Sequence, residues 1–492
     1  MPIQTRLTAE PVRPNGNRSL PFGLMRTVDV QMRRLGLSGF LDGLKSKGVP
    51  LSTVVGLMCV HQLNGGSSMS ECGEWASDPI AVERLCGGRR VSGKTIERAL
   101  DILSVYFDDV MDVLWKGINE CYDVTETNVI VDGSHIPVNG VKSKHSAKGY
   151  GGGGVQEQIR FMVAQLCSPP LPFRVEAYAG NESDSDQYAD FLPMVMRYLK
   201  KGSLLIFDNG GAVKGVLDEI KGSGMEYVTR VDMNENDDEW LEESRHEFAN
   251  IDGDACCIHH TFKSSQRTVY LYFSAGKYIR SVSTAERRAG KMAAVAAENL
   301  YTDRRKPRKS DFLVLKRNPY VNVDIRISVQ KVLDPFDPED NMRAVSDLMG
   351  DRCGMFKLES SLPMDPATAL RVYRYRTTIE HLISSIKSVV RLEPLRVWKP
   401  SSVNGALLMA LIAQLIVSLT IVDLKGTNVR KNVRGKMVDT VTKPSPRTVV
   451  RSLGQLTVTY LDPPAGGAEA VFSNFDPLNS EIMGILDEMG PF

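Results

Sequence analysis

The chain has 492 residues, of which 42% are apolar and 24% charged, and its formal net charge is +1. This length allows two to four domains with substantial cores. The composition is that of an ordinary globular protein, and the balanced charge excludes a strong overall attraction to a polyanion. Eight irregularly spaced cysteines indicate reduced thiols in a cytoplasm rather than a disulfide framework.

The N-terminal part predicts a flexible lead followed by helices. Residues 1–25 are rich in proline and asparagine and lack the apolar segment of a secretory signal, so a cytoplasmic location is expected. Residues 26–125 have helical periodicity interrupted by Gly and Ser pairs. Within them, "VSGKTIERALDIL" is typical of a short helix–turn–helix, although small helical domains show such patterns whether or not they bind DNA.

A different pattern begins near residue 126. Five segments predict strands: "NVIVD" (128–132), "QEQIRFMVAQLC", "PFRVEAYAG", "SLLIFD" (203–208) and "MEYVTRVD". Helical segments lie before and after "SLLIFD". Three strands followed by alternating helices and strands predict an α/β fold with an RNase H-like catalytic core, a mixed sheet flanked by helices. Residues 126–231 form its first part and residues 361–425 its second.

The segment between these two parts predicts a β-rich insertion. Residues 232–360 are mostly strand-like, with one charged helical piece near 282–300. "CCIHH" at 256–260 lacks the usual spacer between zinc ligands, which disfavours a zinc site. The apolar run at 405–422 favours a buried core helix over a membrane span, and no membrane partner is expected. The C-terminal region, 426–492, has strand-like pieces such as "GQLTVTYLDP" and otherwise predicts loops.

Two acidic residues follow apolar strands. Asp132 and Asp208 each come at the end of a predicted strand, and carboxylates at neighbouring strand ends converge at one edge of an open sheet. Taken singly, each aspartate is equally typical of a side chain that caps the next turn. Whether the two aspartates form a metal site depends on a third acidic group.

"YRYRTTIEHLISSIK" (373–387) supplies that group. On one helix, Tyr373, Arg376, Glu380 and Lys387 would lie within about 60° of arc, forming a polar seam. A solvated charged face is the simplest interpretation of this segment alone. The opposite side is apolar and predicts core packing: Ile379, Leu382, Ile383, Ile386 and Val390.

Together, the three carboxylates suit hard divalent cations. Asp132, Asp208 and Glu380 would bind Mg²⁺ or Mn²⁺ rather than zinc. Two such ions support in-line attack on a phosphodiester, in which water cuts a DNA strand and a freed 3′-hydroxyl joins it elsewhere. Arg376 and Lys387 are suited to grip the phosphate backbone.

The spacing Tyr-x2-Arg-x3-Glu-x6-Lys resembles the signature of prokaryotic DDE transposases of the "insertion sequence four" superfamily. "VIVDGSHI" is similar to the first-aspartate block of that superfamily, "LLIFDNGGAV" to the second, and "GNESDSD" to the stretch between them. The resemblance covers most of residues 128–425. It implies a DNA-binding helical N-terminal domain and an insertion between the second aspartate and the glutamate.

This resemblance also implies roles for individual residues. Asp132, Asp208 and Glu380 would be the catalytic triad holding two Mg²⁺ or Mn²⁺ ions. Tyr373, Arg376 and Lys387 would contact double-stranded DNA at the terminal inverted repeats. It further implies action on target DNA, a homodimer that brings two ends together, and a nucleoid-associated protein.

Several alternatives remain open on the sequence alone. Trp240 or Trp398 would suit stacking on an extruded base, but packing in a core is the simpler interpretation. The same scaffold could belong to a nuclease without strand transfer. It could also belong to a catalytically inactive, domesticated DNA-binding protein, although the intact set of three acids argues against that.

Overall fold

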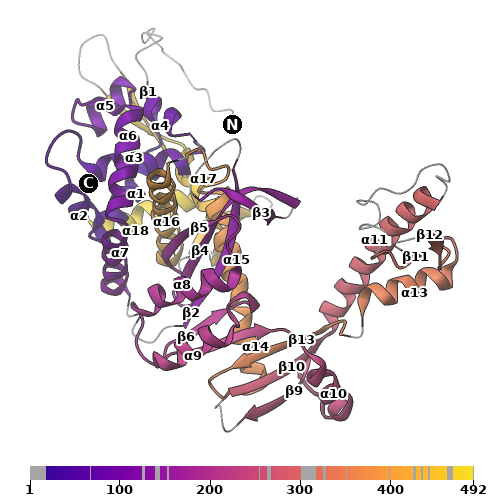
Figure 1. Cartoon of the computed structure of the whole chain (residues 1–492). Coiled ribbons are helices and arrows are strands. Elements are labelled where there is room, and N and C mark those ends of the chain that lie inside the picture. The colour runs from indigo at the N-terminus through magenta and orange to yellow at the C-terminus, as the bar shows by residue number, and fades with distance from the viewer. Residues whose placement is uncertain are drawn as a thin grey trace. The chain divides into compact units, whose positions relative to one another are not determined.

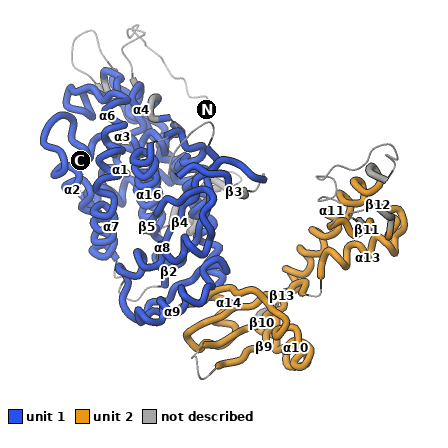
Figure 2. Tube along the Cα trace, in the orientation of Figure 1, with its two compact units in different colours: residues 1–226, 373–492 blue, residues 227–372 orange. Residues whose placement is uncertain are grey.

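The structure is a computed structural model of the whole chain (Figure 1). It divides into two compact units, unit 1 (Met1–Glu226 and Tyr373–Phe492) and unit 2 (Tyr227–Val372), which Figure 2 shows in different colours. The described residues are 18–66, 68–122, 124, 128–138, 145–151, 154–253, 255–262, 267–300, 317–324, 328–350, 352–397, 399–424, 428–433, 436–441, 444–461 and 469–490.

Unit 1 contains a mixed sheet with the strand order β5-β4-β2-β6. The three strands that come first in the chain pair antiparallel, and the fourth, β6, lies parallel to β2. A further strand, β3, pairs with the start of β4. This arrangement confirms the mixed α/β core predicted from the sequence. The bounds are β2 (Asn128–Pro137), β3 (Ala147–Gly151), β4 (Gly154–Leu166), β5 (Pro172–Ala179) and β6 (Leu204–Phe207), with α8 (Asp184–Met196) before β6 and α9 (Lys214–Gly222) after it.

The centre of unit 1 is α16 (Pro400–Asp423), which contacts β5 and several N-terminal helices. By length and composition α16 could cross a membrane, but 89% of its most apolar window is buried within the protein, in agreement with the core-helix interpretation. A Cβ atom at Gly405 would lie 2.4 Å from the Leu100 carbonyl oxygen, so only glycine allows α6 to approach this closely. The N-terminal helices are α1 (Phe22–Arg34), α2 (Leu37–Gly43), α3 (Leu51–Leu63), α4 (Met69–Trp75), α5 (Pro79–Leu85), α6 (Gly93–Val105) and α7 (Phe107–Cys121).

These helices begin within the segment expected to be a flexible lead. Residues 1–17 of that lead lie outside the described residues, but α1 starts at Phe22, directly after β1 (Arg18–Leu20). At its other end, Arg34 donates from Nη1 to both carboxylate oxygens of Asp423, each at 2.9 Å. The Tyr122 hydroxyl donates to the same carboxylate at 2.8 Å. The first helix is thus bound to the last residue of α16.

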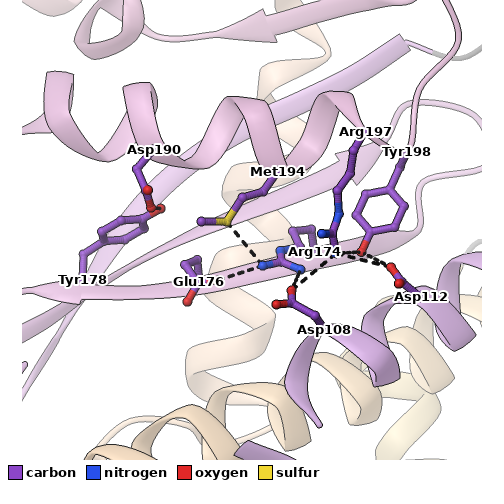
Figure 3. A network of polar contacts seen from close by, with 9 residues as sticks. All are labelled: Asp108, Asp112, Arg174, Glu176, Tyr178, Asp190, Met194, Arg197 and Tyr198. Carbon is purple, nitrogen blue, oxygen red and sulfur yellow. Dashed lines mark hydrogen bonds and ion pairs between the residues drawn. The ribbon is translucent and has the colours of Figure 1, made fainter. Parts of the chain in front are cut away.

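A second polar network joins α7 to the sheet and to α8 (Figure 3). Arg174 of β5 has a side chain only 2% exposed, and its Nη1 donates to Asp108 of α7 at 2.5 Å. Its Nη2 donates to Glu176 at 2.9 Å and to the Met194 sulfur of α8 at 3.3 Å. Since α7 lies in the predicted helical domain and β5 in the predicted core, buried ionic contacts join those two segments.

The C-terminal region has more regular structure than its sequence predicted. The expected strand within "GQLTVTYLDP" is present as β16 (Thr457–Leu461), between β1 and β17 (Glu469–Ser473). The expectation that the remainder consists of loops is wrong, because it contains α17 (Pro446–Gln455), α18 (Pro477–Met489) and the hairpin β14 (Asn428–Val433)–β15 (Lys436–Val441). Both helices follow a side-chain cap, Ser445 or Asp476, with proline in the first turn.

Unit 2 contains five antiparallel strands in the order β7-β13-β10-β9-β8 and three longer helices. The expected strands at "CCIHHTFKS" and "RTVYLYFSA" are β9 (Ala255–Phe262) and β10 (Arg267–Ser274); most of "FLVLKRN" lies outside the described residues. The helix expected near 282–300 starts at Ala275, where the Ser274 hydroxyl accepts from the Lys277 amide. The other bounds are β7 (Glu226–Val231), α10 (Glu235–Ser244), β8 (Ala249–Asp252), α11 (Ala275–Leu300), β11 (Val321–Asp324), β12 (Ser328–Lys331), α13 (Pro338–Met349) and β13 (Met355–Ser360).

Candidate active site

The parallel pairing of β2 with β6 brings the two aspartates together. Asn128 lies opposite Leu204 and Ile130 opposite Ile206, so the same register places Asp132 opposite Asp208. Both positions are two residues beyond the last pair and therefore project to the same face of the sheet. Here the ladder between the strands has ended, which leaves room for both carboxylates.

The expectation that Asp132 ends its strand is wrong. β2 continues to Pro137, and its pairing with β4 runs without interruption from Gly133 opposite Met162 to Pro137 opposite Gln158. What ends near Asp132 is only the shorter parallel ladder with β6. Asp208 does follow its strand directly, since β6 stops at Phe207.

The segment that carries the third acid forms two helices instead of one. α14 (Pro366–Arg374) ends before Tyr375, and α15 (Arg376–Ser388) begins after it. The hydroxyls of Thr377 and Thr378 donate to the carbonyls of Arg374 and Tyr375, which offers the backbone a local alternative to helical hydrogen bonds. The single polar seam is therefore wrong, because Tyr373 lies on α14.

The rest of the seam lies on α15 as expected. Its apolar side is buried, with exposures of 0% at Ile379, 6% at Leu382, 8% at Ile383, 2% at Ile386 and 0% at the nearby Val390. This packing fixes the opposite face of α15, and α15 contacts β2 and β4. Arg376 and Glu380, one helical turn apart on α15, thereby face the strand that carries Asp132.

One guanidinium nitrogen connects all three acids. Arg376 Nη2 lies 3.0 Å from Asp208 Oδ2, 3.2 Å from Asp132 Oδ2 and 3.8 Å from Glu380 Oε1. Three residues that are far apart in the sequence are thus gathered around a single positive charge. The structure brings together every member of the expected triad.

Backbone amides hold the other oxygen of each aspartate. The Gly133 amide donates to Asp132 Oδ1 at 2.9 Å, and the Asn209 amide donates to Asp208 Oδ1 at 2.7 Å. Each carboxylate consequently has one oxygen fixed by the following residue, while its Oδ2 is directed at the shared centre. Glu380 is held less tightly, with a side chain 54% exposed.

At this site, burial and the charges of neighbouring residues shift the pKa values of Asp132 and Arg376 in opposite directions. Burial raises the pKa of Asp132 above its ordinary value, and the Asp208 charge raises it further, whereas Arg376 and the Gly133 amide lower it. For Arg376, burial acts to lower the pKa, but Asp132 and Asp208 outweigh it and raise the pKa above the usual range. The arginine is therefore charged, and its charge stabilises the carboxylates in their ionised form.

The loop after Asp208 needs its glycines to approach α8. A Cβ at Gly210 would lie 2.8 Å from the Asp184 Cβ, and one at Gly211 would lie 2.9 Å from the Tyr188 ring. Tyr188 is buried beneath this loop, and its hydroxyl donates to the Val131 carbonyl at 3.4 Å. The Asn-Gly-Gly sequence thus lets the second aspartate sit directly over α8 and beside the first.

Lys387 and Tyr373 lie outside the ionic cluster. Lys387 Nζ is 3.7 Å from Glu393 Oε2, and burial lowers the pKa of its amine although Glu393 opposes this. Tyr373 is half-buried in the last turn of α14. Its charge interaction with Arg376 is among the causes that raise the arginine pKa.

Two further basic residues near the site, His135 and Arg160, were not predicted from the sequence. His135 lies opposite Arg160 in the pairing of β2 with β4. Burial lowers the pKa of His135, and the charges of Lys387 and Arg160 lower it further. His135 follows Asp132 by three residues, but a histidine in a strand has no distinctive spacing signal. Arg160 is itself paired with Asp184 of α8.

Of the two tryptophans considered for base stacking, the structure describes only Trp240. Trp240 packs against a cluster formed by Ile258, Leu271 and Met355, as its core interpretation predicted. Trp398 lies outside the described residues.

The three acids have the chemistry that a hard divalent ion requires, because all are carboxylates. Backbone amides already fix the orientation of two of them, Asp132 and Asp208. As they stand, no three acidic, histidine or cysteine side chains in the described part of the chain are arranged to hold a metal ion. The reason at this site is Arg376, whose Nη2 occupies the point on which the carboxylates converge. The donor set is present, with a guanidinium between its members.

A comparison with protein families shows the family to which this chain belongs. The model of the family described as "Transposase DDE domain" matches residues 125–416, more than half of the chain and all three acids. The chain belongs to the transposase DDE domain family. It is a DNA transposase, and transposase DDE domains in general depend on divalent metal ions.

Comparison with curated protein sequences finds no match to the transposase. Among solved structures, it is similar to one described as a cryo-EM structure of the piggyBac transposase synaptic complex with hairpin DNA. That similarity has a TM-score of 0.39 and 12% sequence identity, and it covers 88% of this chain and 78% of the other. Membership of the family rests on the family model.

Proposed function

We propose that the transposase cuts DNA at the inverted-repeat ends of an insertion sequence and joins those ends to target DNA. The observation that carries this proposal is the convergence of Asp132, Asp208 and Glu380 on one cationic centre. These residues would be the catalytic, metal-binding triad. The Tyr-Arg-Glu-Lys spacing supports placement in the prokaryotic "insertion sequence four" superfamily.

The triad would hold two Mg²⁺ or Mn²⁺ ions, which activate the attacking water or 3′-hydroxyl and stabilise the leaving oxygen. Asp132 and Asp208 would contribute their Oδ2 atoms, because a backbone amide already holds Oδ1 of each. Glu380, which is more exposed, completes the set from α15. Fixing two of three ligands in advance reduces the entropy that ion binding must overcome.

The DNA would lie along the cationic side of the site. Tyr373, Arg376 and Lys387 are the proposed contacts to double-stranded DNA, both at the terminal repeats and at the target. Lys387 supplies a point charge, whereas a guanidinium suits bidentate contact with a phosphate. A homodimer would bring the two ends together, and the protein would act at the nucleoid in the cytoplasm.

The test is a joining reaction. Labelled DNA carrying the inverted repeats that flank the reading frame is incubated with the protein, a target plasmid and Mn²⁺. We expect cleaved ends and covalent end–plasmid products, both absent in EDTA. Cleavage without joining would identify a nuclease, and binding without cleavage would identify an inactive DNA-binding protein.

A further inference from the structure

Arg376 has an unusual position for a cation. It is the first residue of α15, where the helix dipole disfavours positive charge. Its side chain is only 20% exposed, which adds a desolvation cost. Three carboxylates on Nη2 offset both effects, so these acids must be what holds the side chain in place.

The guanidinium of Arg376 carries less charge than the acids it faces. In the ion pairs with Asp132, Asp208 and Glu380, it supplies one positive charge to three carboxylates. A guanidinium therefore keeps the acids together but does not neutralise them. One divalent cation at the same point would compensate more of the carboxylate charge than the guanidinium does, and two would outweigh it.

We propose that Arg376 is an intramolecular counter-ion that occupies the metal position until divalent ions displace it. Before metal binds, it holds the three acids in their converged arrangement. When metal binds, the guanidinium leaves the carboxylates and becomes available to a DNA phosphate. This exchange rests on the proposed metal-binding role of the triad, and it assigns Arg376 a positioning role before its contact with DNA.

The exchange requires only a movement of one side chain. Arg376 has a long, partly exposed side chain at the start of its helix, so it can rotate without moving α15. Lys387 is not an alternative counter-ion, because it lies beside Glu393 and has no described contact with the triad. Metal binding and release of the guanidinium would thus be coupled events.

The experiment measures Mn²⁺ binding to the full-length protein without DNA, by calorimetry and by the electron paramagnetic resonance signal of free Mn²⁺. The proteins are wild type, Arg376→Met, Arg376→Lys and Asp208→Asn. Because a competing cation is removed, we expect Arg376→Met to bind Mn²⁺ roughly tenfold more tightly than wild type. Arg376→Lys should fall between them. The control Arg371→Met removes an arginine whose described contact is with Thr368 and should not change the affinity.

A second measurement separates exchange from a permanent structural role. In EDTA, Arg376→Met should unfold at a lower temperature than wild type, because its acids repel one another. In saturating Mn²⁺ this difference should disappear. An equal loss of stability in both conditions would show a fixed structural contact and overturn the proposal.

The possible failures are distinguishable. If Mn²⁺ binding is lost in Asp208→Asn but is unchanged or weaker in Arg376→Met, counter-ion exchange is wrong while the metal-binding triad stands. If wild-type protein binds no Mn²⁺, or Asp208→Asn binds it equally well, both proposals fail. If Arg376→Met does not fold in EDTA, the Mn²⁺ affinity of Arg376→Lys is compared with that of wild type instead. Equal Mn²⁺ affinities of these two proteins would then contradict counter-ion exchange.

Discussion

Arg174 and Arg376 each gather several carboxylates in unit 1, but their surroundings differ. Arg174 is 2% exposed and uses separate nitrogens, Nη1 for Asp108 and Nη2 for Glu176. Arg376 is 20% exposed and presents a single nitrogen to three acids. The first arrangement distributes its carboxylates over two nitrogens, whereas the second concentrates negative charge at one point.

Under the proposed function, this difference separates a structural ion cluster from a metal-binding one. Near Arg174, a second cation, Arg197, lies 3.3 Å from Asp112 and 3.4 Å from Asp108, so positive charge is shared among the acids (Figure 3). Around Arg376, the same guanidinium nitrogen makes the ion pairs to all three acids of the triad. Excess negative charge at a partly exposed point suits an incoming metal ion, and a buried, shared network suits permanent packing.

The largest expected effect is on chemistry at the Arg376 cluster. Asp132→Asn, Asp208→Asn or Glu380→Gln should each reduce cleavage of end DNA to background, because each removes a metal ligand. Binding of the same DNA in a gel-shift assay should persist. Asp190→Asn is a matched control, since this acid accepts from the Tyr178 hydroxyl away from the site. Full cleavage by any of the three variants would exclude that residue from the triad.

The next effect concerns stability at the Arg174 cluster. Arg174→Met leaves Glu176, whose side chain is 20% exposed, without its ion-pair partner and should lower the free energy of unfolding by about 3–5 kcal/mol. Arg197→Met, at a side chain 45% exposed in the same network, should cost less than about 1 kcal/mol. Denaturant unfolding measures both. Equal losses of unfolding free energy in the two variants would contradict the proposed distinction between buried and exposed arginines of this network.

A smaller effect is expected on DNA binding. Lys387→Ala should reduce the slope of log affinity against log salt by about one, because one fewer phosphate contact releases fewer counterions. Lys200→Ala is the control, as this exposed lysine lies between α8 and β6, outside the N-terminal helices. A slope identical to that of wild type would remove Lys387 from the DNA contacts.

The smallest effect is a pH dependence from His135. Its pKa is lowered in the folded protein, first by burial and then by Lys387 and Arg160. Below the unfolded pKa of about 6.5, the unfolded chain therefore binds the proton more readily, and stability falls as pH falls. Thermal unfolding at pH 7 and pH 5 should show a smaller loss for His135→Gln than for wild type. Equal losses would show that His135 does not contribute.

The elements of the catalytic core could be predicted because their signals are local. Apolar runs ending in aspartate marked β2 and β6, and helical periodicity marked the buried face of α15. The apolar composition of α16 identified a core helix. Convergence of Asp132 and Asp208 followed from the pairing of neighbouring strands, whereas Glu380 joins them through the packing of α15 against β2.

Details set by tertiary contacts could not be predicted. The break at Tyr375 depends on threonine hydroxyls that compete with helical hydrogen bonds. The extension of β2 beyond Asp132 depends on its partner β4. Burial of Arg174 within an ordinary strand sequence has no local signal. Only the Arg376–Glu380 contact had one, a four-residue spacing that permits an ion pair on a helix.

The place of α16 in the chain affects when the enzyme becomes competent. This helix follows all three acids, yet it packs against α1, α3, α6 and α7, which leave the ribosome first. A nascent chain therefore holds its early helices without their central partner until translation has passed residue 423. Chains that end before α16 should therefore lack the element on which α1, α3, α6 and α7 pack.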